Sequence, residues 1–203
     1  MTTNKKYYSI FIIIGVLIAV GYYISIPYFK IGGEFDISYD NQDLGINFIN
    51  KKNEIYKLTD YFLQILPERK GVSFGFDDRT DRYYFIIREF RKNGNIEYHT
   101  GENLKKDSDE FIKLLNIIGW HHSELQILLE KLKSANCIGI FKQPYENIPV
   151  NITFRYGEPW GVAKFSYYVF PKPLNDSLIK VWNKKEGFVR QNDSLYFEYG
   201  YPL

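Results

Sequence analysis

The sequence predicts an α+β protein in which one N-terminal transmembrane helix precedes a mostly antiparallel α+β domain with a central helical hairpin. Three patterns support this prediction. An uncharged apolar run extends from Tyr7 to Phe29. Apolar residues then recur at helical spacing in three segments, and several short segments alternate apolar and polar residues as half-buried strands do. Helices and strands that come in groups, instead of in strict alternation, favour the α+β class.

The apolar run is long enough to cross a bilayer. As a helix, residues 7–29 would extend about 34 Å, and a hydrocarbon core is about 30 Å thick. Tyrosines lie near both ends of the run, as interfacial aromatic residues do in membrane proteins. We therefore expect an uncleaved single-pass anchor in the lipid bilayer. The alternative is a secretory signal with an apolar core at 10–20 and cleavage after Gly21, which would release the rest of the chain.

Lysines predict the orientation of this anchor. Lys5 and Lys6 precede the run, whereas Lys30 alone follows it closely, before acidic residues. Because the more positive flank stays in the cytoplasm, we expect a cytoplasmic N-terminus and an extracytoplasmic domain. A domain at the cytoplasmic face is the competing hypothesis. The predicted boundaries are 1–6 for the cytoplasmic N-terminus, 7–29 for the transmembrane helix, 30–50 for a tether and 51–203 for the soluble domain.

Charge and cysteine content exclude several functions. The chain has a net charge of +2, and without the three lysines that flank the apolar run the remainder has a net charge of −1. A near-neutral domain lacks the basic surface of a nucleic-acid-binding protein, so we expect no nucleic-acid partner. Cys137 is the single cysteine. An intrachain disulfide and a multi-cysteine zinc site are therefore impossible.

The first part of the domain is predicted to contain one helix and a β-meander. The tether is expected to end in a short strand at 45–49. A helix is predicted over 53–66, where apolar residues recur every three or four positions until Pro67. The next segments predict strands at 72–76, 83–91 and 96–99. Residues 92–95, Lys-Asn-Gly-Asn, have the Asn-Gly signal of a tight hairpin between the last two strands.

Two helices are predicted to form the central hairpin. One is capped by Asp107 or Ser108 at its start and by Gly119 at its end, and the other covers 123–134. We expect the two helices to pack together around Trp120. The rest of the chain predicts strands at 137–141, 150–156, 162–170, 187–190 and 195–199, and a short helix at 176–182.

The helical hairpin contains a local resemblance. The segments Trp120-His121-His122-Ser123-Glu124-Leu125 and 129–140, with Lys-Ser-Ala-Asn-Cys-Ile at its centre, resemble a loose group of short bacterial proteins without an assigned activity. The resemblance implies that the Ala-Asn-Cys-Ile stretch leads into a strand. It implies no function, because the group offers no catalytic residues to transfer.

Three groups of side chains suggest catalysis or metal binding, and a structural role is favoured for each. His121 and His122 are adjacent and therefore point apart, whereas metal-binding histidines on a helix share one face. His99 is distant from both in the sequence. Cys137 begins a predicted buried strand, where cysteine behaves as a small apolar residue. The acidic loop around Asp81 lacks the spacing of a calcium-binding loop. We therefore predict no metal and no cofactor.

Aromatic residues provide the feature that favours binding. They gather in or beside the last predicted strands, and strand alternation turns part of them away from the core. An exposed aromatic patch would mark a ligand or partner site. The candidate binding residues are Tyr156, Trp160, Tyr167, Tyr168, Tyr196 and Tyr199. Scattered, half-buried tyrosines are the alternative interpretation.

The sequence thus predicts a membrane-anchored binding or interaction module, with a protein or small-molecule partner that it does not identify. The alternative is a membrane-tethered enzyme that uses residues such as His121, Glu124 or Asp81, which would require two of them to meet in one pocket. The sequence has no phosphate-binding glycine loop, nucleophile elbow or His-Glu-x-x-His pattern, and the glycines from Gly71 to Gly75 lie within a predicted strand and do not count as such a motif. The binding module is therefore favoured over the enzyme.

Overall fold

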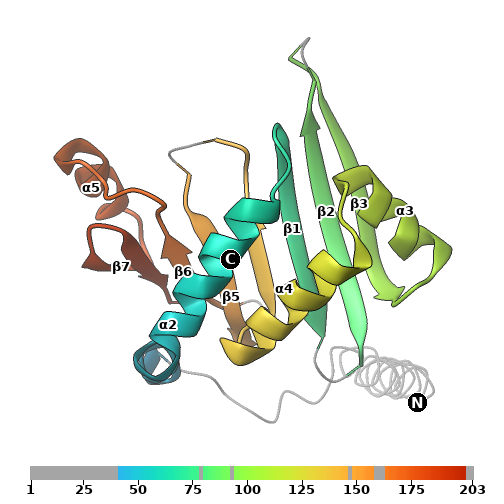
Figure 1. The fold of residues 1–203 in the computed structure, drawn as a ribbon. Helices are drawn as coiled ribbons and strands as arrows, with labels where there is room; N and C mark the ends of the chain where they lie inside the picture. Colours follow the sequence, from blue (N-terminus) through green and yellow to red (C-terminus); the bar gives the residue numbers. More distant parts are fainter. Residues whose placement is uncertain (1–40, 78–79, 92–93, 146–147, 158–162, 200–203) are drawn as a thin grey trace, which may run out of the picture. The chain divides into compact units, whose positions relative to one another are not determined.

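The computed structural model describes residues 41–77, 80–91, 94–145, 148–157 and 163–199 (Figure 1). The predicted anchor at 7–29 lies outside this range, and within it no helix is long and apolar enough to cross a membrane. The described part is an α+β structure, as predicted. Its elements are α2 (Asn41–Ile65), β1 (Lys70–Asp77), β2 (Arg82–Phe90), β3 (Ile96–Lys105), α3 (Asp109–Ile118), α4 (His122–Ser134), β4 (Gly139–Lys142), β5 (Val150–Gly157), β6 (Ala163–Val169), α5 (Asp176–Trp182), β7 (Phe188–Asn192) and β8 (Leu195–Glu198).

The described strands form one sheet in the order β3-β2-β1-β4-β5-β6-β8-β7. Every pairing in it is antiparallel, which confirms the predicted antiparallel class. The meander β1-β2-β3 and the later strands meet where β1 pairs with β4. The third predicted strand, expected to end at His99, continues to Lys105.

Alternation along the strands gives the sheet one strongly apolar face. In β1, Val72 and Phe74 are buried and lie opposite Ile87 and Phe85 of β2. Helices α2 and α4 cross this face diagonally in Figure 1, and residues of α2, α3 and α4 belong to the same buried core as the strands. The face that carries these residues therefore supplies most of the hydrophobic stabilisation of the described part.

The strand predicted at 45–49 is wrong, because these residues are helical and belong to the first half of α2. Leu44 and Asn47 are buried one helical turn apart, so this half turns one side to the core. At Lys51 the backbone leaves the helical region, with φ −123° and ψ 17°, and the helix is kinked there. The helix predicted over 53–66 is thus the second half of a longer element.

The two helices predicted as a hairpin have different main partners. Ser108 and Gly119 cap α3 as predicted, with Gly119 in the left-handed conformation at φ 88°. However, α3 packs on β3, whereas α4 packs alongside α2. Trp120, between the helices, has its ring against Phe62 of α2, and its Nε1 donates a hydrogen bond to the Ile65 carbonyl at 2.8 Å. The tryptophan therefore joins this connection to α2 and not to a helical hairpin.

The helix α5 covers part of the opposite face of the sheet. Tyr168 and Tyr196 are cross-strand neighbours next to the pair Tyr167 and Phe197, so they point to the other side. They pack with Trp182 of α5 in a second, smaller apolar cluster. The prediction of a helix at 176–182 is confirmed, and its role is to close this cluster.

Candidate functional site

The described tyrosines among the six predicted binding residues do not form one surface. Tyr167 and Tyr196 are fully buried, and they lie on opposite faces of the sheet. Tyr168 and Tyr199 are half-buried. Trp160 and the side chain of Tyr156 lie outside the part of the chain that the structure describes. The side chains of Tyr167 and Tyr196 have no exposed area that a ligand could contact. An aromatic binding surface made by the other candidate residues therefore stays a prediction.

Tyr167 is a structural residue. Its hydroxyl donates to the Leu44 carbonyl at 3.0 Å and accepts a hydrogen bond from Asn47 Nδ2 at 2.9 Å. Burial raises the pKa of this phenol well above its ordinary value. A neutral hydroxyl with two partners in the core connects α2 to the sheet and is unavailable to a ligand.

Tyr168 belongs to the second apolar cluster. Its hydroxyl donates to Glu198 Oε2 at 3.1 Å, and its ring lies 4.9 Å from the ring of Phe188, centroid to centroid. The pKa of Tyr168 is raised, mainly by burial and further by the Glu198 carboxylate. Because its ring and its hydroxyl both have partners, packing explains this tyrosine without a ligand.

The residues of the alternative enzyme hypothesis have local structural roles. The backbone N–H of His121 donates to Glu124 Oε2 at 2.7 Å, which caps the start of α4. His122 Nδ1 lies 3.5 Å from Asp107 Oδ1, on the surface. Asp81 accepts a hydrogen bond from the Tyr83 hydroxyl at 3.4 Å in the turn before β2. These contacts serve a helix end and a turn, and none of them brings two of the proposed catalytic residues into a described pocket.

Cys137 lies in the core, as expected. Its Sγ donates to the Ala135 carbonyl at 3.3 Å, and burial raises the pKa of the thiol to about 12. The thiolate is the nucleophilic form of cysteine. A buried thiol with a raised pKa is therefore unsuited to nucleophilic catalysis.

A lysine and a serine on the second face of the sheet form a polar cluster. Lys164 Nζ donates to Asn151 Oδ1 at 2.7 Å, and its pKa is lowered by burial, although Glu198 opposes that shift. Ser166 Oγ and Asn151 Nδ2 are buried, and no described residue bonds either atom. Ser166 is fully buried. Its hydroxyl cannot reach a substrate from solvent, so the cluster is not a site of nucleophilic attack.

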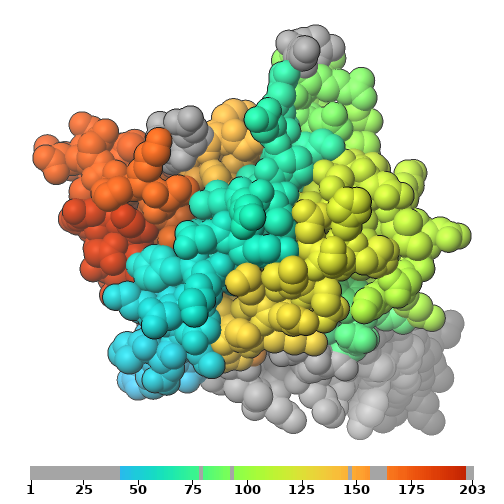
Figure 2. All heavy atoms as spheres, in the orientation of Figure 1, coloured from blue at the N-terminus to red at the C-terminus, as the bar shows by residue number. Residues whose placement is uncertain are grey.

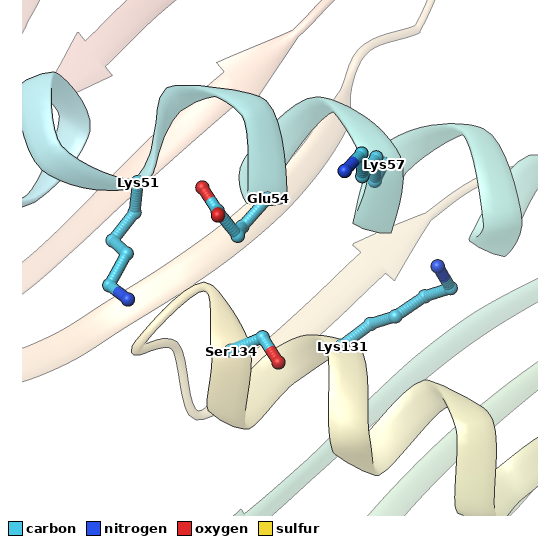
Figure 3. Close-up of a pocket in the computed structure, with 5 residues that line it drawn as sticks. All are labelled: Lys51, Glu54, Lys57, Lys131 and Ser134. Carbon is cyan, nitrogen blue, oxygen red and sulfur yellow. The ribbon is translucent and has the colours of Figure 1, made fainter.

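A groove lies between α2 and α4 on the outer side of the helical layer. Figure 2 shows these two helices side by side on the surface of the molecule. In Figure 3, Lys51 extends from α2 toward α4, and Lys131 extends from α4 toward α2. The groove has a volume of about 390 Å³, within the usual range for small-molecule sites. Its lining residues are Lys51, Glu54, Lys57, Lys131 and Ser134.

The groove has an excess of positive charge. Three lysines line it against the single carboxylate of Glu54. Within the described ranges, no carboxylate lies within ion-pair distance of Lys51, Lys57 or Lys131, although Lys131 Nζ lies 5.3 Å above the ring of Tyr61. Lys51 lies at the kink of α2, where the backbone leaves the helical region. The sequence pattern did not indicate this site, because α4 and α2 are about 80 positions apart and their pairing is a tertiary feature.

Two carboxylates and one imidazole also meet on the β2-β3 hairpin. Ligand atoms of Glu89, Glu97 and His99 all lie within 4.8 Å of one another, and the three side chains are partly buried. His99 is distant in the sequence from His121 and His122, so no metal site was predicted at this histidine. The signal that could have found it is Glu-x-His on one strand with a glutamate on the neighbouring strand.

No family model, curated protein or solved structure matches the chain.

Proposed function

We propose that the chain is a membrane-anchored binding protein and that the groove between α2 and α4 takes a small molecule with a phosphate or carboxylate group. The single observation behind this proposal is the set of three lysines around one groove without ion-pair partners among the described residues. Ammonium groups bind phosphate as point charges, and three lysines along one groove give it a positive field that attracts an anion. The uncharged run at 7–29 supports the anchor.

Both helices of the groove are well positioned to present charge. Lys131 comes from the last turns of α4, whose inner side is buried through Leu128 and Leu132. Lys57 is on the second half of α2, next to the buried Leu58. Because the two helices belong to the same core, the backbone positions of the groove lysines are fixed relative to one another, and binding has only to order their side chains.

Substituting Glu54 should change the affinity for an anion in the opposite direction to substituting the groove lysines. Its carboxylate lines the groove and repels an anion, so Glu54→Gln should tighten binding, whereas Lys51→Gln and Lys131→Gln should weaken it. The probes are inorganic pyrophosphate and citrate, titrated calorimetrically into the full chain in detergent. Lys180→Gln is the matched control, since this lysine lies on α5, on the other side of the sheet.

The expected result is at least a tenfold weaker affinity for each groove lysine variant and no change for Lys180→Gln. Added salt should weaken binding in the wild-type chain, because exposed charges are screened. The proposal fails if neither probe binds, or if Lys180→Gln lowers the affinity as much as Lys131→Gln does.

A further inference from the structure

We propose that Glu89, Glu97 and His99 form a binding site for one divalent transition-metal ion of the zinc class. The site lies on the β2-β3 hairpin, on different elements from the α2-α4 groove, and it does not depend on the function proposed for that groove. No metal was predicted from the sequence. The proposal rests on strand register, on ligand distances and on the charges around the three side chains.

Strand register brings the three residues together. Glu89 of β2 lies directly opposite Glu97 of β3, and His99 lies opposite Ile87, two positions further along both strands. Residues two apart on a strand share a face, so Glu97 and His99 point to the same side as Glu89. The hairpin backbone thus fixes all three side chains on one face without any loop.

The distances suit a metal ion. His99 Nε2 lies 3.6 Å from Glu97 Oε1, and all three ligand atoms lie within 4.8 Å of one another. With zinc bonds of about 2.0–2.1 Å, two tetrahedral ligand atoms are separated by about 3.4 Å. Small rotations of the side chains would therefore bring the atoms to bonding positions around one ion.

The charges around the hairpin leave one carboxylate without compensation. Like charges directly opposite each other on paired strands are destabilising, and Glu89 faces Glu97 in this way. Lys70 is the cross-strand neighbour of Glu89 on its other side, but its Nζ donates to the Ile117 carbonyl instead. Arg91 pairs with Glu97. Among the described residues no cation pairs with Glu89, so a bound metal ion would relieve this repulsion.

The donor set selects the class of metal. Imidazole favours zinc, copper, iron and nickel, whereas calcium and magnesium prefer oxygen ligands alone. Two carboxylates and one imidazole give three protein ligands, which leaves a fourth tetrahedral position for water or an external ligand. We therefore expect Zn²⁺ and Co²⁺ to bind and Mg²⁺ to bind far more weakly.

Arg91 distinguishes a metal site from a purely structural ion-pair cluster. If the cluster is only an ion-pair network of Arg91, Glu97 and His99, Arg91→Ala removes a contact and should leave the affinity for a metal ion unchanged. If the cluster is a metal site, Arg91 competes with the metal for Glu97, and Arg91→Ala should tighten metal binding severalfold.

The experiment measures Zn²⁺ by competition with a chromophoric chelator, and Co²⁺ by its visible absorption, on the full chain in detergent without a histidine tag. The wild-type chain should bind one equivalent, and His99→Ala and Glu89→Gln should each weaken Zn²⁺ binding at least tenfold. His122→Ala is the matched control, because His122 also lies 3.5 Å from a carboxylate, Asp107 Oδ1, but no third ligand joins them among the residues that the structure describes.

Three outcomes would overturn the proposal. The first is a wild-type chain that binds no Zn²⁺ at micromolar concentration. The second is a bound equivalent whose affinity is the same in His99→Ala and in the wild type. The third is a loss in His122→Ala equal to the loss in His99→Ala. All the substituted residues are exposed or partly buried, so the variants should fold. An unchanged circular dichroism spectrum would show that a loss of metal binding is not caused by a loss of fold.

Discussion

Asn47 Nδ2 donates a hydrogen bond to the hydroxyl of Tyr167 at 2.9 Å, across 120 positions of the sequence. The same Nδ2 also donates to the Ala135 carbonyl at 3.2 Å, and Asn47 Oδ1 accepts from Asn136 Nδ2 at 3.1 Å. One buried amide on the first half of α2 is therefore bonded to the sheet and to the end of α4. These contacts stabilise a helical segment that its own sequence supports poorly.

Replacing Asn47 with alanine should destabilise the first half of α2. Asn47→Ala removes the two donated hydrogen bonds and the one accepted from Asn136, and it leaves the Ala135 carbonyl without this donor, at a cost of about 1–3 kcal/mol. Thermal unfolding of the full chain in detergent measures the loss. Hydrogen exchange should accelerate at 41–50 more than in β1 and β2. Tyr167→Phe should give a similar but smaller change, since it removes only the hydroxyl.

Asn50→Ala is the control for this prediction. Asn50 is exposed on the same helical segment, and alanine has the higher helix propensity, so the substitution should be neutral or slightly stabilising. Equal losses in Asn47→Ala and Asn50→Ala would mean that helix propensity, and not the buried network, decides the stability of this segment.

Strands were predictable where alternation is local, and the first half of α2 was not. The segments at 150–156 and 162–170 alternate clearly, and both are strands within one residue of the expected bounds. At 41–50, glycine and asparagine lower the helix propensity, and the segment is helical because Leu44 and Asn47 meet distant partners. Tertiary contacts of this kind leave no periodic signal in the sequence.

The candidate sites depend on pairing that the sequence does not specify. Alternation correctly separates Tyr167 from Tyr168, but it does not say that α5 covers the face of Tyr168. The groove needs α4 beside α2, although the sequence favoured α4 beside α3. The pair Glu89 and Glu97 needs the register of β2 and β3, which the turn and the strand ends determine together.

The thiol of Cys137 should be unreactive in the folded chain. Its thiol is buried, so an aromatic disulfide reagent should react with it only after unfolding, and a fast reaction in the native chain would contradict the burial. Because burial raises its pKa from 9.0 to about 12, the folded state holds the proton more tightly than the unfolded state. The stability that it contributes is complete below pH 9 and is lost as the pH rises from 9 toward 12. Cys137→Ala should therefore show a shallower fall of the unfolding temperature between pH 9 and 11.

Alanine at position 75 should destabilise the fold while Tyr84 is present. A Cβ at Gly75 would overlap the ring end and the hydroxyl of Tyr84, the residue opposite it on β2. Gly75→Ala must therefore displace this ring, at a cost of about 1–3 kcal/mol. In a Tyr84→Ala chain the same substitution should be neutral or stabilising by about 0.5–1 kcal/mol, because alanine restricts the unfolded chain more than glycine does.

The double-mutant cycle is read from the unfolding temperatures of the four chains. Gly45→Ala is its control, since a Cβ there would meet no atom within 4 Å, and alanine should stabilise the helix. Additive effects of Gly75→Ala and Tyr84→Ala would show that the ring does not require the glycine.

The membrane orientation can be tested by labelling one introduced thiol, because the native thiol of Cys137 is buried. In a Cys137→Ala background, Ser123→Cys introduces one thiol at an exposed position near the start of α4. If the domain is extracytoplasmic, as Lys5 and Lys6 predict, a membrane-impermeant maleimide should label this thiol in intact cells or in spheroplasts, and the labelled chain should resist alkaline extraction from the membrane. A cytoplasmic domain would be labelled only after lysis. A labelled chain that alkaline treatment releases would indicate signal cleavage, because the loss of 1–21 leaves too short an apolar segment to span the bilayer.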